Sequence, residues 1–560
     1  MNRLLKLLTC VLLLVAMLVG CSPKGSDQPT TTAPSTEPTG PVVPEKLTLD
    51  QKLAQIATLG TSPDDNYRVW YEIFVYSFCD SNGDGVGDLQ GVISKLDHLQ
   101  ELGVNGIWLM PIHPSTSYHK YNVNDYYKID PKYGTMEDFE ALIYQCNQRG
   151  IKVILDLVVN HTGSRHKWFL DACSYLKGLN GKEPNPAECQ YVDYYNFVLT
   201  KDAPATGYTR VAGSDYSYES KFSSDMPDLK LHNPQLREDI ADIMAFWLDK
   251  GAAGFRVDAA KEFYSGNSDK NIEFMNWMQQ TVTSFKPDAY MVAEVWDAFG
   301  ILANYYKSGF TSIFNYRYGD NSGELIQTVL AAGNGAIVNK YAKKLQKTHE
   351  AYAKNNPNYI DAPFVSNHDV GRIAGFVGRD ENKTKIAGAM NLFMSGSAFI
   401  YYGEEIGMTC GATNDPSYRA PMVWNAAGDN GTPKPPPGCT LPEEYVFGSL
   451  EEQRKDESSI YNYYRQAVAI RQAMPVISHG YIVEESALNN STVSAQRKIW
   501  GDEECIILMN IDTVANDVDL SAYKDWKLAT SLTVGDDQVY MDGDVMKMPA
   551  YGIAILVPAK

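Results

Sequence analysis

The chain has 560 residues, of which 44% are apolar and 21% are charged, a composition typical of globular and not of disordered proteins. This length predicts two or three domains. The 68 acidic residues against 49 basic ones give a formal net charge of −19, which disfavours nucleic acids and anionic membrane surfaces as partners.

Residues 1–21 predict a secretory leader. Arg3 and Lys6 precede the apolar run Leu7–Val19, which is too short to cross a bilayer comfortably. The run is followed by Gly and Cys21 and resembles a bacterial lipobox, in which the cysteine is lipidated and becomes the new N-terminus. We therefore expect a lipid anchor on Cys21 at the extracellular face of a bacterial cell membrane. A plain secretory signal is the alternative.

Residues 22–45 are rich in Ser, Thr, Pro and Gly and lack apolar periodicity, which indicates a flexible tether. The chain has nine cysteines, of which Cys10 and Cys21 belong to the leader. Disulfides are permitted outside the cytoplasm, although their connectivity cannot be deduced from a sequence. The plausible local pairs are Cys173 with Cys189 and Cys410 with Cys439.

From about residue 68 onward, stretches whose apolar residues recur at helical spacing are each followed by a glycine and then by a short apolar run. The pattern predicts helices that end at Gly103, Gly150 and Gly251, each followed by a buried parallel strand. The eight expected strands are, in chain order, Tyr71–Phe78, Asn105–Pro111, Lys152–Val159, Gly254–Ala260, Ala289–Trp296, Thr311–Tyr316, Pro363–Asp369 and Ala398–Glu404.

Eight strands separated by helical stretches favour an α/β fold of the (β/α)8 TIM-barrel type over a doubly wound sheet. We assign this barrel to residues 46–474. The long and weakly periodic stretch 162–232 after the third strand predicts an insertion domain. Short alternating runs between turn residues in 475–560 predict a C-terminal antiparallel β domain, a β-sandwich.

Charged residues stand at the C-terminal ends of four expected strands, which is the catalytic face of a (β/α)8 barrel. They include the three acids Asp258, Glu294 and Asp369. Any one of these residues could be structural, because a strand-end Asp often caps the next helix. Three acids at three strand ends, with Arg256 two residues before the first of them, indicate a catalytic site instead.

These strand ends carry four segments, which read DLVVNH, GFRVDAAK, AEVW and SNHD, and they resemble the four conserved regions of the α-amylase family, glycoside hydrolase family 13. The resemblance implies that Asp258 is the nucleophile, Glu294 the general acid/base and Asp369 the third carboxylate. It implies that three further residues orient the substrate and the nucleophile at the cleaved sugar. These are Arg256, His161 and His368.

Further segments extend the resemblance. The sequence from His119 to Tyr121 is similar to the family segment whose tyrosine stacks under the cleaved sugar, with Asp125 as a supporting residue. Lys261 matches a lysine that contacts leaving-group sugars, but Glu262 stands where amylases often have His. The segment MPDL at residues 226–229 resembles a form found between the oligo-1,6-glucosidase and neopullulanase groups.

The physical chemistry of glycoside cleavage fits these roles. The reaction needs one acid to protonate the leaving oxygen and one carboxylate to stabilise the oxocarbenium-like transition state. Arg256 beside Asp258 is expected to keep the nucleophile ionised. Glu294, close to two other carboxylates, is expected to have a raised pKa and to stay protonated.

A second group of residues predicts calcium binding. Side-chain oxygens at positions 1, 3, 5 and 9 of residues 80–88, with glycine at position 6, match the start of an EF-hand loop. The loop is no EF-hand, because position 12 is Gly91 and a strand precedes the loop. The alternative to a calcium site is a Gly/Asp-rich turn. The resemblance implies a calcium site with the ligands Asp80, Asn82, Asp84, the Val86 carbonyl and Asp88.

The resemblance also implies that Asn160 binds a second calcium ion. For the substrate, we expect α-1,4-linked glucans, because the small Ala259 follows the expected nucleophile where α-1,6-specific relatives tend to carry Val. The protein is expected to act as a monomeric α-amylase on starch, glycogen and maltooligosaccharides.

Four alternatives remain open from the sequence. The enzyme could be an oligo-1,6-glucosidase or neopullulanase, or a transglycosylating relative. A non-catalytic glucan-binding lipoprotein is disfavoured because all three acids are present. A zinc hydrolase built on His119, His161 and His368 is disfavoured because no His-x-His pair occurs.

Overall fold

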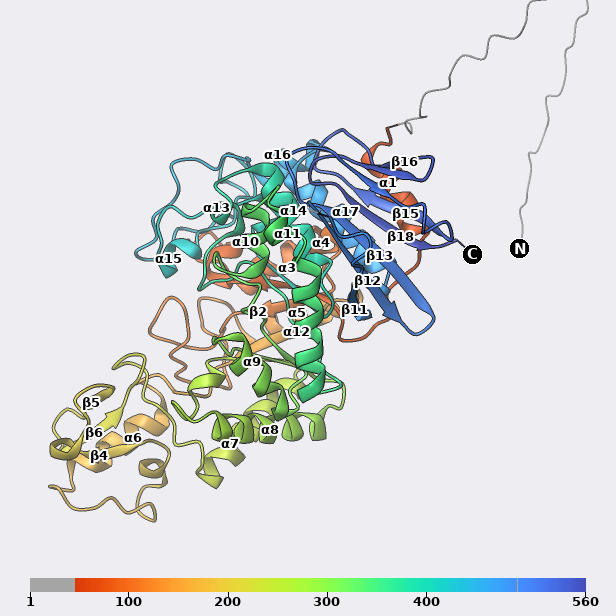
Figure 1. Ribbon diagram of the computed structural model, residues 1–560. Helices are drawn as coiled ribbons and strands as arrows, with labels where there is room; N and C mark the ends of the chain where they lie inside the picture. The colour runs from red at the N-terminus through yellow and green to blue at the C-terminus, as the bar shows by residue number, and fades with distance from the viewer. Residues whose placement is uncertain (1–45, 491, 560) are drawn as a thin grey trace, which may run out of the picture. The chain divides into compact units, whose positions relative to one another are not determined.

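The computed structural model describes residues 46–490 and 492–559 (Figure 1). The expected signal peptide, tether and lipidation of Cys21 lie outside the described residues. No helix in the described part of the chain has the length and apolar character needed to cross a membrane.

The centre of the fold is a sheet of seven parallel strands in the order β10-β1-β2-β3-β7-β8-β9. Each of these strands is buried along almost its whole length, as in a barrel with a packed interior. The strands are β1 (Val69–Ile73), β2 (Gly106–Leu109), β3 (Lys152–Leu157), β7 (Gly254–Val257), β8 (Tyr290–Ala293), β9 (Ser312–Ile313) and β10 (Ala398–Tyr401).

An eighth segment, residues 361–363, closes the barrel between β9 and β10 without forming a ladder of its own. On one side the Asn315 amide donates to the Ala362 carbonyl at 3.0 Å. On the other side the Ser397 and Phe399 amides donate to carbonyls of the segment at 2.7 and 2.9 Å. The (β/α)8 barrel is therefore confirmed. The expected strand Pro363–Asp369 is wrong in extent, because Pro363 has no N–H to donate to a ladder and residues 364–369 turn away from it.

Each of the other seven expected strands is shorter in the structure than predicted, and one expected helix is divided. The strand expected over Tyr71–Phe78 ends at Ile73, where its pairing with Leu109 of β2 also ends, and α2 (Val75–Phe78) follows. The helix expected to end at Gly103 is divided at Lys95, which ends one helix and begins the next.

Local sequence signals begin and end the barrel helices. Thr135 and Asp138 form a capping box at the start of α5, and Asn233 caps α7 with Pro234 in its first turn. Gly103 ends α4 with a positive φ of 87°, which glycine adopts without steric cost. The helices up to the sixth barrel strand are α1 (Leu49–Ala57), α3 (Leu89–Ser94), α4 (Leu96–Leu102), α5 (Met136–Gln148), α6 (Lys167–Lys177), α7 (Pro234–Asp249), α8 (Ser268–Phe285) and α9 (Phe299–Tyr305).

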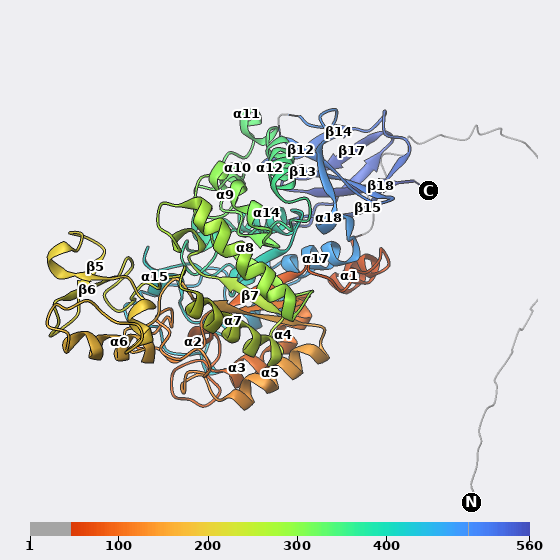
Figure 2. The same cartoon turned by 90° about the horizontal axis from the view of Figure 1, so that it is seen from below.

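The later helices cover the rest of the barrel and lead to the C-terminal strands (Figure 2). They are α10 (Glu324–Leu330), α11 (Gly335–Val338), α12 (Tyr341–Asn355), α13 (Ile373–Phe376), α14 (Glu381–Leu392), α15 (Asp415–Tyr418), α16 (Leu450–Lys455), α17 (Ile460–Ala473) and α18 (Val476–His479).

The stretch between β3 and α7 folds around α6 and a small antiparallel sheet of order β4-β6-β5, which lie together in both views (Figures 1 and 2). Its strands are β4 (Phe197–Leu199), β5 (Tyr208–Arg210) and β6 (Tyr216–Glu219). The Leu229 amide donates to the Asn160 carbonyl at 2.9 Å, so the end of this stretch is joined to the end of β3 beside the catalytic face.

The C-terminal strands form a five-stranded antiparallel sheet of order β11-β12-β13-β18-β15 and a three-stranded sheet of order β14-β17-β16. Lys498 of β12 is fully buried and donates to the Phe393 and Ile477 carbonyls at 2.7 and 2.6 Å, which joins the larger sheet to the barrel helices. The strands are β11 (Tyr481–Glu484), β12 (Val493–Trp500), β13 (Glu503–Asn510), β14 (Asn516–Asp519), β15 (Trp526–Leu532), β16 (Tyr540–Asp542), β17 (Val545–Met548) and β18 (Ile553–Pro558).

All seven cysteines of the described residues are free thiols, so the expected disulfides are wrong. Hydrogen bonds hold both local segments without a covalent link. Near Cys173 and Cys189, the Tyr175 hydroxyl donates to Glu188 at 2.7 Å. Next to Cys439, the backbone amide of Thr440 donates to the Ser417 hydroxyl at 2.9 Å.

Candidate active site

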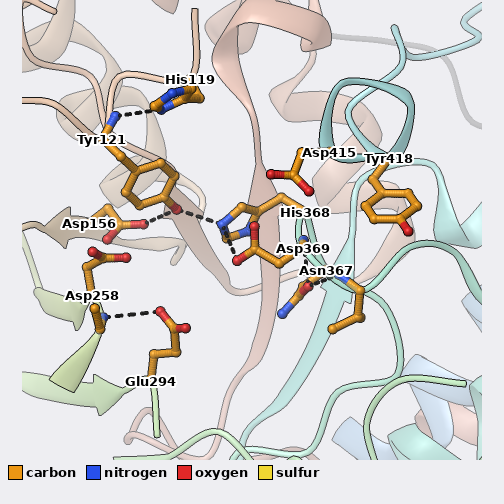
Figure 3. A network of polar contacts seen from close by, with 12 residues as sticks. His119, Tyr121, Asp156, Asp258, Glu294, Asn367, His368, Asp369, Asp415 and Tyr418 are labelled. Atoms are coloured by element: carbon orange, nitrogen blue, oxygen red, sulfur yellow. Dashed lines mark hydrogen bonds and ion pairs between the residues drawn. The ribbon is translucent and has the colours of Figure 1, made fainter. Parts of the chain in front are cut away.

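Polar side chains gather at the C-terminal ends of the barrel strands, around a cavity of about 490 Å³ (Figure 3). Asp258 directly follows β7, Glu294 directly follows β8, and Asp369 lies in the turn after the barrel-closing segment. The expected site residues that line the cavity are His119, Tyr121, His161, Asp258, Lys261, Glu294 and Asp369.

Arg256 lies beneath this cavity and contacts three carboxylates at once. Its guanidinium is 1% exposed. One terminal nitrogen, Nη1, donates to Asp156 at 2.8 Å and to Asp258 at 2.6 Å, and the other, Nη2, donates to Glu294 at 2.5 Å. The three acids can approach so closely because one delocalised cation is shared among them.

Glu294 has a pKa raised to about 7. Burial is the largest cause, and the negative charges of Asp258 and Asp369 raise the pKa further, while Arg256 opposes them. The Ala259 amide also donates to Glu294 at 3.2 Å. Around neutral pH this carboxyl group therefore holds a proton that it can give to a bound molecule.

Asp369 has the opposite shift. Burial by itself raises its pKa, but His368 and Arg419 outweigh burial and hold the pKa below the usual range. His368 Nε2 lies 3.0 Å from one oxygen of Asp369, and Arg419 Nη2 lies 2.8 Å from the other. Asp369 thus stays ionised while Glu294 carries a proton.

Tyr121 connects the histidines of the site. Its hydroxyl donates to Asp156 at 3.0 Å and lies 2.7 Å from His368 Nε2, as Figure 3 shows. Its backbone carbonyl accepts a hydrogen bond from His161 Nε2 at 3.1 Å, and its amide donates to His119 Nδ1 at 3.2 Å. The three histidines of the zinc alternative are therefore each engaged by Tyr121 and do not converge on one point.

Burial lowers the pKa of both His119, to about 4, and His161. Desolvation of the charged form is the largest cause in each case, so both rings are neutral at neutral pH. A neutral ring at the cavity wall can offer one N–H or one lone pair to a sugar hydroxyl.

Residues that follow Asp258 and Glu294 in the chain form a second wall of the cavity. Lys261 pairs with Asp297 at 2.9 Å and donates to the Trp296 carbonyl at 3.2 Å. The rings of Trp296 and Phe222 are 47% and 49% exposed and both line the cavity. Glu262, which stands where amylases often have His, also lines the cavity and forms an ion pair with Lys221 of the insertion.

The structure places Asp125 outside this cluster. Its carboxylate pairs with Lys128 at 2.8 Å and accepts from the Tyr127 amide at 3.0 Å, and it does not line the cavity. Asn160 donates to Asp228 at 2.8 Å and borders a separate cavity of about 100 Å³, which also receives Glu219.

The loop over residues 80–88 folds onto its own backbone amides. Asp80 accepts from the Gly83 and Gly85 amides, each at 2.7 Å, and Asp84 accepts from the Val86 amide at 2.8 Å. Asp88 caps α3 through the Gly91 amide. In the described residues, no cluster of three or more His, Cys, Asp or Glu side chains is arranged to hold a metal ion. The donor set itself, carboxylate, amide and carbonyl oxygens, suits calcium, and an ionised carboxylate retains lone pairs beyond these contacts.

A (β/α)8 barrel that holds two carboxylates, Asp258 and Glu294, on one arginine at its catalytic face has the arrangement that glycoside hydrolases use. Residues 72–480 match the family model described as "Alpha amylase, catalytic domain". The chain therefore belongs to the α-amylase family, glycoside hydrolase family 13.

Similar proteins carry several activities in their names. Eubacterium rectale Amy13B has a solved structure that superimposes with a TM-score of 0.86 at 40% identity, covering 92% of this chain and 99% of that one. "Alpha-amylase 3" of Dictyoglomus thermophilum is 39% identical over 451 residues, 80% of this chain and 85% of that protein. The "Oligo-1,6-glucosidase" of Parageobacillus thermoglucosidasius is 30% identical over 536 residues, with shares of 79% and 90%.

Three residues that contact the expected site residues were not predicted from the sequence. Asp156 and Glu72 are acids within the apolar barrel strands β3 and β1, a signal that could have been used. Arg419 lies in the long stretch after β10 and has no comparable signal, because only the fold brings it to Asp369.

Replacing Arg256 by Met is expected to lower the free energy of unfolding by about 3–5 kcal/mol, because the buried carboxylates lose their shared cation. A fall in the Tm, followed by circular dichroism, measures the effect. The matched control is Arg149→Met, whose exposed pair with Asp97 at 2.9 Å contributes about 1 kcal/mol or less. Equal Tm values for the two variants would contradict this account of the site.

Proposed function

We propose that the protein is a retaining α-amylase that hydrolyses α-1,4 bonds in starch, glycogen and maltooligosaccharides. The observation that carries the proposal is the shared contact of Arg256 with Asp258 and Glu294. One planar guanidinium holding both carboxylates supports the close spacing of about 5 Å that retaining glycosidases use.

In the first step Asp258 attacks the anomeric carbon and forms a glycosyl ester, while Glu294 gives its proton to the departing glycosidic oxygen. In the second step the Glu294 carboxylate takes a proton from water, and the resulting hydroxide equivalent attacks the same carbon. The ester bond to Asp258 breaks and the product has the α configuration. Arg256 donates a hydrogen bond to Asp258 at 2.6 Å and orients its carboxylate.

The other site residues bind the sugar at the cleaved bond. Tyr121 offers its ring as a stacking surface, and the ionised Asp369 accepts hydrogen bonds from sugar hydroxyls, which favours a distorted ring. His119 and His161 line the cavity and contribute further polar contacts, while His368 contacts Tyr121 and Asp369. Lys261 contacts the sugar beyond the cut.

The linkage proposal rests on Ala259, which lines the cavity beside Glu294. A small side chain there leaves room for the acceptor sugar of an α-1,4 bond. The similarity to an α-amylase at 39% and to an oligo-1,6-glucosidase at 30% supports this order of preference. Oligo-1,6-glucosidase or neopullulanase activity, and a transglycosylating enzyme, are the alternatives. A non-catalytic glucan-binding lipoprotein is the weakest alternative, because the acids are all assembled.

The linkage is tested by comparing kcat/KM on maltotetraose and isomaltotriose. We expect the α-1,4 substrate to react faster, although one small side chain shifts discrimination by only about 1–3 kcal/mol. Faster cleavage of isomaltotriose would replace the α-amylase proposal by the oligo-1,6-glucosidase one.

The pH dependence of kcat/KM is expected to show an alkaline limb near pH 7. Glu294, with a pKa of about 7, must be protonated to act as the general acid, so activity is present below this pH and is lost above it. The control substrate is an α-glycosyl fluoride, whose leaving group needs little protonation. Its kcat/KM is expected not to fall above pH 7. The same limb with both substrates would show that another group sets it.

We also propose that residues 80–88 bind calcium for stability and that Asn160 contributes to a second calcium site. The ligands of the first ion are Asp80, Asn82, Asp84, the Val86 carbonyl and Asp88. A bound calcium ion would cross-link a loop that begins and ends close to β1, and it takes no part in the chemical steps.

Removal of calcium with EDTA is expected to lower the Tm, and Asp84→Ala is expected to reproduce this loss without a further effect of EDTA. Asp429→Ala removes an exposed carboxylate outside the loop and is the control. Native mass spectrometry gives the stoichiometry independently of activity. An unchanged Tm with EDTA and no bound calcium would contradict the assignment.

We further propose that a lipid on Cys21 anchors the enzyme, as a monomer, at the extracellular face of the cell membrane. The lipobox-like sequence before Cys21 supports this. Release of the Cys21→Ser variant from the membrane fraction would agree with this proposal. An unchanged share of the variant in the membrane fraction would contradict it.

A further inference from the structure

A buried carboxylate beneath the active site has no role in the mechanism given above. Glu72 lies on β1 and is 1% exposed. Its Oε1 lies 2.5 Å from Nδ1 of His368, on the side of the ring that faces away from the cavity. Burying an acid in the barrel interior costs free energy unless a partner compensates, and His368 is that partner.

His368 has acceptor oxygens at both of its nitrogens. Nδ1 faces Glu72, whereas Nε2 faces Asp369 at 3.0 Å and the Tyr121 hydroxyl at 2.7 Å. A neutral imidazole carries only one N–H, so one carboxylate would meet a lone pair. The doubly protonated ring satisfies both nitrogens.

The remaining groups around His368 do not remove this requirement. Arg419 Nε donates to the His368 carbonyl at 3.1 Å, and the ring of Trp108 lies edge-on at 5.6 Å. Burial alone lowers the pKa of His368, but Asp369 and then Glu72 outweigh it and raise the pKa to about 9. Burial raises the pKa of Glu72, and the charge of His368 opposes this.

We propose that Glu72 is a positioning residue, which holds His368 as a fixed, doubly protonated cation and thereby keeps Asp369 ionised and directed into the cavity. The proposal rests on the proposed hydrolase function. It gives the barrel a line of alternating charges that starts at Glu72, passes through His368 and ends at Asp369, where the sugar binds.

The chain offers a matched comparison for this proposal. Glu405 is also fully buried and also contacts a histidine, since its Oε1 lies 3.1 Å from His98 Nε2. Neither Glu405 nor His98 lines the cavity. A purely structural role for Glu72 predicts that Glu72→Gln and Glu405→Gln behave alike, with lower stability and unchanged catalysis of the folded protein.

The first experiment titrates the unaltered protein, and a variant at His368 serves only to assign its signal. Histidine labelled with ¹³C at Cε1 gives one signal for each of the nine histidines, and loss of a signal in His368→Asn assigns it. We expect the His368 signal to remain that of the charged ring at pH 7 and to titrate near pH 9. A neutral His368 ring at pH 7 would overturn the proposal.

The second experiment measures catalysis at pH 6 on maltotetraose, where Glu294 is protonated. Glu72→Gln keeps a hydrogen-bond acceptor but removes the charge, and it is expected to lower kcat about tenfold or more, with a smaller change in KM, as loss of an orienting partner does. Glu72→Asp, which keeps the charge, is expected to recover part of kcat. Glu405→Gln is expected to leave kcat and KM unchanged.

Equal kcat values for Glu72→Gln, Glu405→Gln and the unaltered protein would overturn the positioning role. Failure of the proposed function has a different signature, because Asp258→Asn would then retain turnover or the unaltered protein would cleave no glucan. If Glu72→Gln does not fold, as circular dichroism would show, the ring titration of the unaltered protein decides the question.

Discussion

The site depends on one buried guanidinium. Arg256 holds Asp156, Asp258 and Glu294 within hydrogen-bond distance of two terminal nitrogens. Without a shared cation, three carboxylates in a desolvated strand end would repel one another and take up protons. Their convergence also needs three adjacent parallel strands, and the order β3-β7-β8 supplies them. The chemistry and the barrel topology are therefore linked through a single side chain.

Two acids at this site have opposite pKa shifts because Glu294 shares its neighbouring cation with other acids, whereas Asp369 has two cations beside it. Glu294 shares Arg256 with two other carboxylates, so burial dominates and its pKa rises to about 7. Asp369 is contacted by His368 on one oxygen and by Arg419 on the other, and its pKa falls. A protonated donor and an ionised acceptor thus line one cavity. Glycoside cleavage requires a carboxyl group that holds a proton near neutral pH, and Glu294 meets this requirement.

The sequence was most informative where residues are close along the chain. The glycine that ends each helix and the apolar run that follows it predicted the barrel, and Asp258, Glu294 and Asp369 were found at its strand ends. Strand extents were less predictable. Pro363 lacks the N–H of a ladder, and Ile73 ends β1 because its neighbour β2 ends there.

Contacts between distant parts of the chain were the least predictable. Arg419 reaches Asp369 through the tertiary fold alone, and nothing in its local sequence indicates this partner. Glu72 stands out as an acid in an apolar strand, but only the fold shows that His368 is its partner. Asp125 was assigned to the site through the resemblance, but it pairs with Lys128 and does not line the cavity. The cysteine pairs failed for a related reason, since proximity in sequence does not fix the geometry that a disulfide needs.

The central claim is that Asp258 forms a covalent bond to the sugar while Glu294 serves as acid and base. It is tested most directly by trapping this intermediate with an activated fluoroglucoside, whose first step is fast and whose second step is slow. Peptide mass spectrometry of the trapped protein is expected to find one added glycosyl group on the peptide that contains Asp258. An unlabelled Asp258 peptide in protein that turns over the reagent, or a label on another carboxylate, would contradict the account.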